Sequence, residues 1–589
     1  MEVKRVFDLL ERAVELYPKE DILAQKKEGK WEKISTQEYY TKSHLLAYSF
    51  NMLGLESNEK IITISNNRPE WNFIDMGCML SNNIHVPIYS TLSDSDYEFI
   101  IEHSDAKLIF VGNNIIGKKI ASIIHKLNKE IILVGIEPFD KYLHIKDLYN
   151  NGLEANEIIK DKINSYKNTI NETDIATIIY TSGTTGTPKG VMLSHKNLVF
   201  NFLSHAVQQI KDNRHKMLSF LPLCHIYERS MNYEYQYLGI STYYAESLST
   251  IASDLADCNA DGFCAVPRVL EMMFNKLENA SKDLKGISKT IYLWAFNLAC
   301  NYDYSKKSLL YKLQHLIADK LVYSKWRSRL GGKEMLIVSG GSSIQEKIIR
   351  LFTAAKLYIF EGYGMTETSP VIAVNNPKEM IIKIGTVGKV VEGTEVKLAE
   401  DGEILVRGPH VMLGYYKDPD YTKEVIDSEG WFHTGDIGQF VDTIFLKITD
   451  RKKEIFKLSA GKYIAPQIIE NKIKESSYID NCMVIGANEK FASAIINLNK
   501  AKVEEFCNNN NILLNVETLN SNIELYNFIE KEISKINKTL AAHENIKRFR
   551  IVIDDWSPIN GLLSQTLKLK RSKILEKYSS LVEEIYNLK

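Results

Sequence analysis

The sequence of 589 residues lacks the features that would place it in a membrane or outside the cell. No apolar run approaches the ~20 residues that a membrane-spanning helix needs. The N-terminus has no uninterrupted apolar segment of the kind that forms a signal peptide. The seven cysteines are scattered, without a CxxC pair or zinc-ligand spacing, so they fit buried free thiols better than a disulfide framework. We therefore expect a cytoplasmic protein, and the sequence leaves peripheral contact with the inner face of a membrane open.

The chain also lacks an excess of charge of either sign. Lys and Arg total 73, Asp and Glu total 74, and the formal net charge is −1. This balance argues against nucleic acid as the main partner. Hydrophobic residues make up 44% and charged residues 25% of the chain, which is the composition of an ordinary globular protein. A chain of this length exceeds one hydrophobic core, so two or more domains are expected.

Short apolar runs alternate with amphipathic segments in the first quarter of the chain. The expected strands are 60–64, 85–89, 107–111 and 130–134, and the expected helices between them are 72–80, 94–103 and 116–127. This alternation predicts an α/β layer with a mainly parallel sheet. The polar residues 150–172 are expected to form a loop, whereas residues 270–330 are helical in pattern and rich in Lys and Tyr.

Beyond residue 380 the hydrophobic period changes to two. Residues 395–399 and 403–407 flank Asp401 and Gly402, which is a strong hairpin signal. This part is expected to form a small antiparallel sheet or barrel. We place a domain boundary at the charged residues 450–453, which gives an N-terminal domain of residues 1–449 and a C-terminal domain of residues 450–589.

A loop of hydroxyl groups and glycines follows the apolar run 175–180. Residues 180–190 read Tyr-Thr-Ser-Gly-Thr-Thr-Gly-Thr-Pro-Lys-Gly. Hydroxyls, a lysine and glycine backbone N–H groups suit a polyphosphate. The stretch is not a Walker P-loop, because Pro188 stands where that pattern needs its second glycine. A flexible surface linker is the competing interpretation; it is disfavoured because a new apolar strand begins directly after Gly190.

Several further segments, in their order and spacing, resemble one family over nearly the whole chain. They are residues 180–190, 221–229, 266–268, 340–341, 361–367, 431–436, 450–453 and 566–568. Together they resemble the adenylate-forming enzymes, specifically the long-chain acyl-CoA synthetases. Residues 221–229 and 266–268 are similar to the fatty-acid branch rather than to the peptide-synthetase branch.

The resemblance implies both a fold and a reaction. The implied fold is α/β: a large N-terminal domain of mainly parallel layers with a small β-barrel-like subdomain, and a small mobile C-terminal α+β domain. The implied reaction uses ATP, Mg²⁺ and coenzyme A. A long-chain fatty acid first forms an acyl-adenylate with release of pyrophosphate, and its acyl group is then transferred to coenzyme A. Since the carboxylate is itself the nucleophile, the protein mainly supplies positioning and charge.

The resemblance also assigns a nucleotide site. The β- and γ-phosphates are expected at Thr181, Ser182, Gly183, Thr184, Thr185, Gly186, Thr187 and Lys189. The rest of the nucleotide is expected at Gly340, Gly341, Glu361, Gly362, Tyr363, Gly364, Thr366, Asp436 and Arg451. Glu367, with Thr181, is expected to hold Mg²⁺, because this ion usually takes only one or two carboxylates plus phosphate and water.

Lys568 matches the late catalytic lysine of the family, although Ser564 and Gln565 replace the family's Thr-Pro pair; Lys570 is the alternative. A lysine suits this role because its compact charge can approach carboxylate and α-phosphate oxygens together. The other expected catalytic residues are Thr366, Glu367 and His225.

The family rotates its C-terminal domain about a hinge, which falls at Lys453 here. That rotation would remove Lys568 and bring Gly461 to the thiol arm of coenzyme A. An ordinary turn glycine is an equally good interpretation of Gly461. His225 is expected at the junction of the acyl and thiol sites, although a lone histidine is usually structural. Arg268 could pair with a carboxylate or cap a helix.

Other interpretations stay open at this point. The acyl group could pass to a carrier protein instead of coenzyme A, the substrate could be another carboxylic acid, or the chain could be a non-catalytic lipid-binding relative. The tyrosines at 227–244 are better explained as core than as an acyl channel. A solvated charged face explains residues 270–330 better than a tunnel wall or a membrane-facing surface does. Chain-length preference and oligomeric state lie beyond the sequence.

Overall fold

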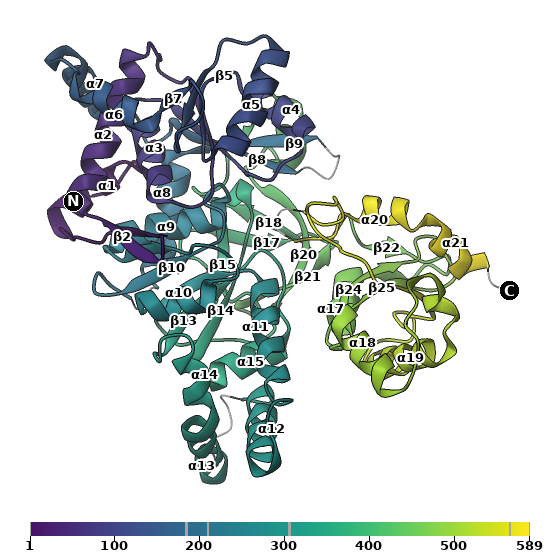
Figure 1. The fold of residues 1–589 in the computed structure, drawn as a ribbon. Helices are drawn as coiled ribbons and strands as arrows, with labels where there is room; N and C mark the ends of the chain where they lie inside the picture. The colour runs from purple at the N-terminus through teal and green to yellow at the C-terminus, as the bar shows by residue number, and fades with distance from the viewer. Residues whose placement is uncertain (1, 183–186, 209–210, 304–307, 565–566, 588–589) are drawn as a thin grey trace.

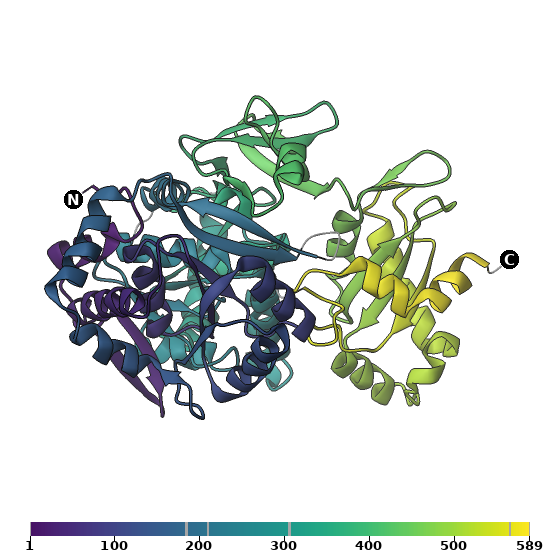
Figure 2. The same cartoon turned by 90° about the horizontal axis from the view of Figure 1, so that it is seen from above.

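The computed structural model describes residues 2–182, 187–208, 211–303, 308–564 and 567–587. Two large sheets with their helices make up the chain before residue 450, and a smaller sheet lies beside them (Figures 1 and 2). The expected α/β class is confirmed, because parallel strands run through both large sheets and a separate α+β region follows them.

An eight-stranded sheet forms the N-terminal layer. Its strands are β3 (Lys60–Ile64), β4 (Ile84–Ile88), β5 (Ala106–Val111), β6 (Ile132–Gly135), β7 (Leu143–His144), β8 (Ile175–Ser182), β9 (Pro188–Ser194) and β19 (Gly414–Tyr415). They lie in the order β19-β9-β8-β4-β3-β5-β6-β7. The strands from β8 to β6 are parallel, and β9 returns antiparallel along β8. The four strands expected at 60–134 are therefore confirmed.

The helices of this layer are α1 (Asp8–Leu16), α2 (Thr36–Met52), α3 (Pro69–Leu80), α4 (Asp94–Ser104), α5 (Asn114–Leu127), α6 (Ile145–Leu153) and α7 (Glu157–Thr169). The three helices expected between the strands correspond to α3, α4 and α5. The loop expected at 150–172 is wrong, because α7 occupies most of it. Asn156 caps this helix by accepting a hydrogen bond from the Ile159 amide. The helix is mostly exposed, with Ile163 buried, so its sequence carries little hydrophobic signal.

A thirteen-stranded sheet forms the second layer. Its strands are β1 (Leu23–Lys27), β2 (Lys30–Ile34), β10 (Lys216–Ser219), β11 (Ser241–Tyr244), β12 (Gly262–Ala265), β13 (Met335–Ser339), β14 (Leu357–Gly364), β15 (Val371–Val374), β16 (Lys389–Val390), β17 (Glu395–Leu398), β18 (Glu403–Arg407), β20 (Phe432–Val441) and β21 (Phe445–Arg451). The strands from β1 through β11, β10, β12 and β13 to β14 are parallel. The strands β15–β18, β20 and β21 continue the sheet in antiparallel pairs, including the expected hairpin of β17 and β18.

The helices that follow β9 are α8 (His195–Ala206), α9 (Ile226–Leu238), α10 (Ile251–Cys258), α11 (Pro267–Asn279), α12 (Gly286–Cys300), α13 (Leu309–Ala318), α14 (Ser324–Ser328), α15 (Glu346–Ala354) and α16 (Pro419–Val425), with the single turns η1 (Asp319–Tyr323) and η2 (Thr366–Thr368). Helix α9 is buried along nearly its whole length, since Ile226 and Tyr233 pack into one core and Met231 and Tyr235 into another. The tyrosines of this region are therefore mostly core residues, as expected.

The C-terminal region forms a two-stranded sheet and a three-stranded sheet of its own, with two hydrophobic cores. It contains β22 (Phe456–Lys457), β23 (Tyr463–Ile464), β24 (Ile479–Ile485), β25 (Ser493–Leu498), β26 (Arg548–Val552), α17 (Pro466–Ile473), α18 (Lys500–Asn509), η3 (Val516–Ser521), α19 (Ile523–Asn537), α20 (Arg571–Lys577) and α21 (Ser579–Asn587). Helices α17, α18 and α19 share one hydrophobic core with the three-stranded sheet of β24, β25 and β26, whereas α20 and α21 contribute to another. The region lies beside β20 and β21 of the large sheet (Figure 1).

All seven cysteines fall within the described residues and are free, six of them buried. This agrees with the expected scattered thiols. Among the described helices, none is long and apolar enough to cross a bilayer.

Candidate active site

The hydroxyl-rich stretch lies at the turn between β8 and β9. Thr181 pairs directly with Lys189 across the two strands, so the two residues face each other near the turn of the hairpin. The Lys189 ammonium lies 2.8 Å from the centre of the Tyr421 ring and 5.5 Å from that of Tyr415. Such contacts hold the cation at the mouth of the loop. Thr187 is exposed at the loop's end.

Gly183, Thr184, Thr185 and Gly186 lie outside the described residues, as does the side chain of Ser182. Their expected phosphate contacts therefore stay predictions.

The end of β14 carries the next group of expected residues. Glu361, Gly362, Tyr363 and Gly364 occupy its last four positions. Burial raises the pKa of the Glu361 carboxyl to about 8. A Cβ on Gly364 would lie 1.8 Å from the Pro370 carbonyl oxygen, so only glycine fits there. The strand can therefore turn sharply into η2, which carries Thr366 and Glu367.

Asp436 and Arg451 meet across two neighbouring strands. They are register partners on β20 and β21, with Arg451 Nε 3.5 Å from Asp436 Oδ1. The Tyr363 hydroxyl donates a hydrogen bond of 2.7 Å to Asp436 Oδ2. Three residues that are far apart in the sequence thus form one polar group. A carboxylate in this position is suited to accept the hydroxyls of a ribose.

Glu367 is held against the β8–β9 hairpin. The Tyr415 hydroxyl donates a 2.8 Å hydrogen bond to Glu367 Oε1, and Tyr415 itself pairs with Val191 of β9. Burial raises the pKa of Glu367, although the Tyr415 hydrogen bond opposes the shift. A divalent cation would reverse that shift, since a nearby positive charge favours the carboxylate.

The surroundings of Glu367 fit Mg²⁺ better than a metal held by protein alone. Within the described residues, no group of three or more His, Cys, Asp or Glu side chains is arranged to hold a metal. Mg²⁺ needs no such group, because substrate phosphates and water complete its ligands. One carboxylate held against the hairpin that carries the hydroxyl-rich loop meets that requirement.

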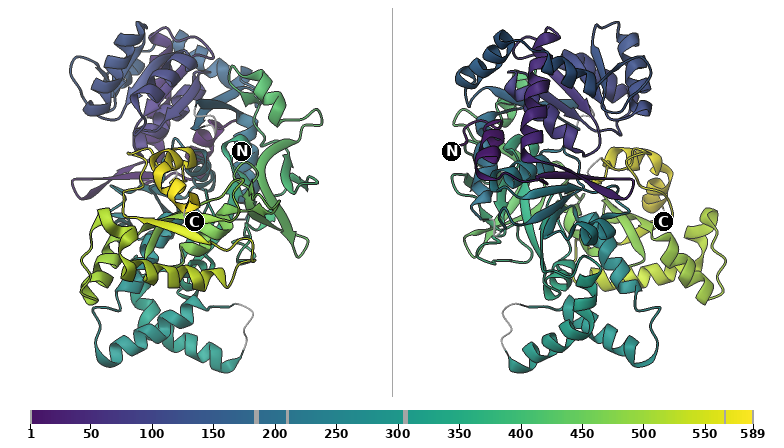
Figure 3. Two further views of the ribbon diagram at one scale, coloured as in Figure 1. Left: turned by 90° about the vertical axis from the view of Figure 1, so that its right-hand side faces the viewer. Right: turned by 60° about the vertical axis from the view of Figure 1, so that its left-hand side comes forward.

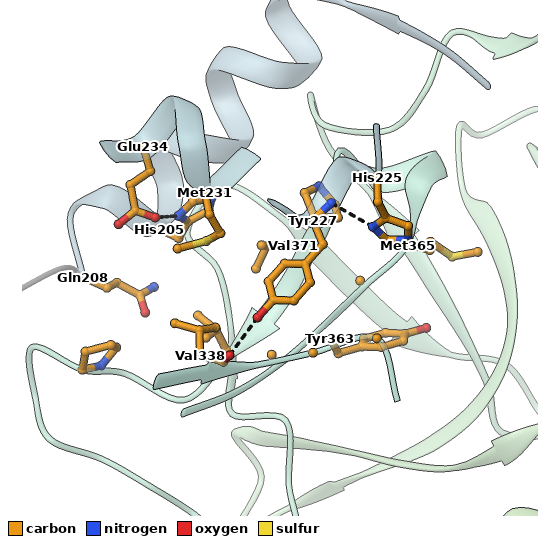
Figure 4. Close-up of a pocket in the computed structure, with 17 residues that line it drawn as sticks. His205, Gln208, His225, Tyr227, Met231, Glu234, Val338, Tyr363, Met365 and Val371 are labelled. Atoms are coloured by element: carbon orange, nitrogen blue, oxygen red, sulfur yellow. Dashed lines mark hydrogen bonds and ion pairs between the residues drawn. The ribbon is translucent and has the colours of Figure 1, made fainter. Parts of the chain in front are cut away.

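An apolar pocket of about 710 Å³, including its open mouth, begins beside these residues (Figure 4). It runs from Tyr363 and Met365 past the Tyr227 ring to Met231 and the His205–Glu234 pair. Tyr227 is fixed by a 2.9 Å hydrogen bond to the Val338 carbonyl. A Cβ on Gly340 would lie 3.3 Å from that ring, so this glycine keeps the passage open between ring and strand. The lining is mostly apolar, which suits a hydrocarbon chain.

His225 lies at the pocket's edge, directly before α9, as the N-cap of that helix. Its Nδ1 accepts a hydrogen bond from the Tyr227 amide at 3.2 Å, so it caps the helix. Burial, with a contribution from Lys568, lowers the pKa of His225 to about 4. The imidazole is therefore neutral near pH 7, and both a structural role and an acyl-site role agree with this geometry.

A buried charge network holds α9 in place. Arg229 pairs with Asp75 of α3 and donates to Thr177 of β8 at 2.7 Å. Asp75 also accepts hydrogen bonds from Tyr233 at 2.6 Å and pairs with His85 at 2.7 Å. The network therefore joins the helix that His225 caps to the strand that leads into the hydroxyl-rich loop.

Lys568 reaches this site from the C-terminal region. Two hydrogen bonds hold its backbone: the Ser564 amide donates to the Lys568 carbonyl at 2.7 Å, and the Lys568 amide donates to Ser564 Oγ at 3.0 Å. Burial and the charge of Arg451 lower the pKa of the ammonium to about 8, whereas Asp436 and Glu367 oppose that shift. The lysine therefore lies within electrostatic range of the residues expected to bind ribose and Mg²⁺.

Three further residues named from the sequence lie outside this group of side chains. Arg268 pairs with Glu271 at 3.5 Å and with Asp480 at 3.7 Å, which answers the open question in favour of a carboxylate partner. Lys453 lies in the turn after β21. Gly461 lies in the turn between β22 and β23, with a φ of +83°, and a role at the thiol arm stays a prediction.

The sequence did not single out Tyr415, Tyr421, His205 or Glu234. Tyr415 ends the short strand β19 and Tyr421 lies in α16, neither within a recognisable motif, and their partners Glu367 and Lys189 are distant in the sequence. His205 and Glu234 pair across α8 and α9, and only the packing of these helices reveals that they close the pocket.

Comparison with known proteins gives two family matches. Residues 10–416 match the model of the AMP-binding enzyme family, and residues 453–589 match that of the AMP-binding enzyme C-terminal domain. The chain is 30% identical over 576 residues to a long-chain-fatty-acid–CoA ligase of Mycobacterium bovis, covering 95% of this chain and 93% of that protein. It is 31% identical over 623 residues to long chain acyl-CoA synthetase 4 of Arabidopsis thaliana, covering 98% of this chain and 91% of that protein.

Solved structures share the fold. O-succinylbenzoate coenzyme A synthetase from Bacillus subtilis, in complex with AMP, is 19% identical with a TM-score of 0.69, covering 96% of this chain and 97% of that chain. The A-PCP didomain of a carboxylic acid reductase from Segniliparus rugosus, also with AMP, is 18% identical with a TM-score of 0.76, covering 100% of this chain and 82% of that chain.

Proposed function

The chain belongs to the AMP-binding enzyme family, and we propose that it is an AMP-forming long-chain fatty acid:CoA ligase. The observation that carries this proposal is that Lys568 lies within electrostatic range of Asp436, Arg451 and Glu367, beside an apolar pocket. Groups suited to a nucleotide, to a carboxylate and to a hydrocarbon chain therefore lie next to one another. Named relatives of this activity that match nearly the whole chain support the choice.

In the first half-reaction, a carboxylate oxygen of the fatty acid attacks the α-phosphorus of ATP. The bond from that phosphorus to the bridging oxygen breaks, and pyrophosphate leaves. Lys189 and the hydroxyl-rich loop hold the leaving phosphates, and Asp436 with Arg451 holds the ribose. Lys568 stabilises the charge on the α-phosphate and carboxylate oxygens as they approach each other. Glu367, with Thr181 as a second contact, would hold Mg²⁺, which would supply charge neutralisation at the phosphates.

In the second half-reaction, the thiolate of coenzyme A attacks the acyl carbon, and AMP leaves. Lys568 then stands where the thiol arm must approach, so the C-terminal domain, residues 450–589, rotates about a hinge near Lys453. Gly461 takes a place at the thiol arm in that second arrangement. The acyl chain keeps its position in the pocket past Tyr227 throughout.

We further propose that the enzyme works in the cytoplasm and contacts a membrane peripherally. Free, mostly buried cysteines agree with a reducing compartment.

Pyrophosphate release tests the proposed activity. Fatty acids of graded chain length are supplied with ATP and Mg²⁺, with and without coenzyme A. Long-chain acids should give the fastest release and should yield a thioester when coenzyme A is present. Release without any thioester would favour a carrier protein as acceptor, and release only with short or aryl acids would favour another carboxylate. No release with any acid would overturn the ligase proposal.

A further inference from the structure

Helices α12 and α13 project from one end of the molecule, away from both the C-terminal region and the N-terminal layer (Figures 1 and 3). The outer side of α13 and η1 carries an unusual row of large aliphatic side chains. This leucine face consists of Leu309, Leu310, Leu313, Leu316, Ile317 and Leu321, all exposed. Leu309 is 86% and Leu316 is 69% exposed. Soluble monomers seldom present such a continuous apolar face without a partner for it.

Packing on the opposite side fixes the direction of the leucine face. The His315 ring lies 5.0 Å from that of Tyr302 and 4.6 Å from that of Tyr311. Ala318 and Val322 are buried on the same inner side. The Tyr323 hydroxyl donates to the Ala295 carbonyl at 2.9 Å, which ties η1 to α12. The leucines therefore cannot turn inward without breaking this aromatic packing.

Basic residues surround the leucine face. Residues 285–329 contain nine Lys and Arg and only two Asp, a net of +7 in a chain whose overall net charge is −1. The described lysines of the segment are Lys285, Lys289, Lys312, Lys320 and Lys325, all exposed. Within the described residues, none of these five forms an ion pair with a carboxylate. Lys312 and Lys320 lie on the same helical side as the leucines.

We propose that the leucine face with its lysine rim docks the protein on an anionic lipid bilayer. An apolar helix face that is flanked by unpaired cations is the combination that places a helix in the plane of a membrane interface. Anionic headgroups attract the lysines, and the leucines enter the boundary of the acyl chains. A second copy of this chain fits less well, because two rims of like charge would face each other. This inference names a lipid partner and does not depend on the ligase reaction.

Vesicle flotation of the full chain tests the proposal without ATP, coenzyme A or fatty acid. Vesicles of phosphatidylcholine with phosphatidylglycerol should carry the protein, and vesicles of phosphatidylcholine alone should carry much less. Leu309→Gln, Leu313→Gln and Leu316→Gln, combined, should lower binding by about tenfold or more. A matched control replaces Ile115, Leu153 and Ile158 by Gln; these residues are similarly exposed on the N-terminal layer and the change should leave binding unaltered.

A second variant tests the same proposal in case the leucine variant fails to fold. Lys312→Glu, Lys320→Glu and Lys325→Glu change only exposed charges, and should lower binding to the anionic vesicles by about tenfold or more. Sedimentation velocity without lipid measures self-association of each protein.

The proposal is overturned if the native chain does not float, or if the leucine variant binds as the native chain does. It is also overturned if the native chain is a dimer that the leucine variant dissociates, because a second copy would then cover the face. Pyrophosphate release is measured separately, so failure of membrane binding and failure of the ligase proposal remain distinguishable.

Discussion

At the scale of single residues, Lys568 and His225 differ in the charge that burial leaves them near neutral pH. Burial lowers the pKa of both groups, to about 8 for Lys568 and to about 4 for His225. The imidazole is therefore uncharged over the whole neutral range, whereas the lysine changes charge just above it. A group whose pKa lies near the working pH is often a functional one.

The lysine pKa predicts a pH dependence with a definite sign. Lys568 is positive below pH 8 and loses its proton as the pH rises through about 8. Since the charge stabilises the approach of two anions, kcat/KM for pyrophosphate release should fall above that pH. Burial also raises the pKa of Glu361 to about 8, so the profile of the native enzyme alone does not identify the group.

Lys568→Arg separates the two groups, because arginine stays protonated throughout this range. Whatever activity the variant keeps should show no fall above pH 8. A fall that persists unchanged in the arginine variant would assign it to Glu361 or another carboxyl and contradict the role of Lys568.

At the scale of elements, the buried pair of Asp75 and Arg229 fastens α9 between α3 and β8. Removing one partner of a buried ion pair leaves the other charge uncompensated and typically costs about 3–5 kcal/mol. Asp75→Ala should therefore lower the temperature of thermal unfolding by several degrees. Calorimetry measures the shift.

An exposed pair serves as the control for that prediction. Arg407 and Glu395 form an ion pair at 2.8 Å on the surface of β17 and β18. Glu395→Ala should leave the unfolding temperature unchanged within error, because water screens both charges. Equal shifts in the two variants would show that the Asp75–Arg229 network does not hold α9.

The sequence predicted the elements that have a strong hydrophobic pattern better than those that lack one. The strands between 60 and 134 have strong apolar runs, and both their positions and the helices between them are confirmed. Helix α7 was predicted as a loop because Ile163 alone is not a hydrophobic pattern. Residues 270–330 were correctly predicted as helical, but a solvated charged face does not describe α13, where exposed leucines lie between the lysines.

Much of the candidate site followed from short segments that combine glycines with polar residues, because those combinations have few structural uses. Tyr363, Asp436 and Arg451 were all named from the sequence, and the structure brings them together. Two other contacts at or near the site could not be named in this way. Tyr415 and Glu367 are joined by a single hydrogen bond, and Asp75 and Arg229 by a buried ion pair, so only the folded chain shows that these residues meet.

At the scale of the whole molecule, the described contacts between the C-terminal region and the rest of the chain include several between polar or charged side chains, such as Arg268 with Asp480 and Lys502 with Asn279. Asn471 donates to Ser343 Oγ at 2.6 Å, and Gln345 donates to the Lys474 carbonyl at 3.2 Å. Polar contacts of this kind break and re-form readily in water, so they agree with a domain that moves.

Crosslinking tests that motion. In Ser343→Cys/Asn471→Cys, a short bis-maleimide should fix the C-terminal domain in the arrangement described here. Pyrophosphate release should then persist, whereas thioester formation should fall by about tenfold or more, because Lys568 cannot leave the site. The untreated double variant and each single variant are the controls, since Cys300 is only half-buried. Unchanged thioester formation in the crosslinked protein would exclude the rotation.

The most direct test of the central claim is the separate measurement of the two half-reactions in Lys568→Ala. Lys570→Ala is the matched control, because Lys570 is exposed two residues away. The account predicts that Lys568→Ala slows pyrophosphate release by about a hundredfold or more. It also predicts that this variant still converts supplied acyl-adenylate and coenzyme A to thioester at close to the native rate. Equal loss of both steps, or loss of pyrophosphate release in Lys570→Ala instead, would contradict an adenylation site that is completed by Lys568 of the C-terminal domain.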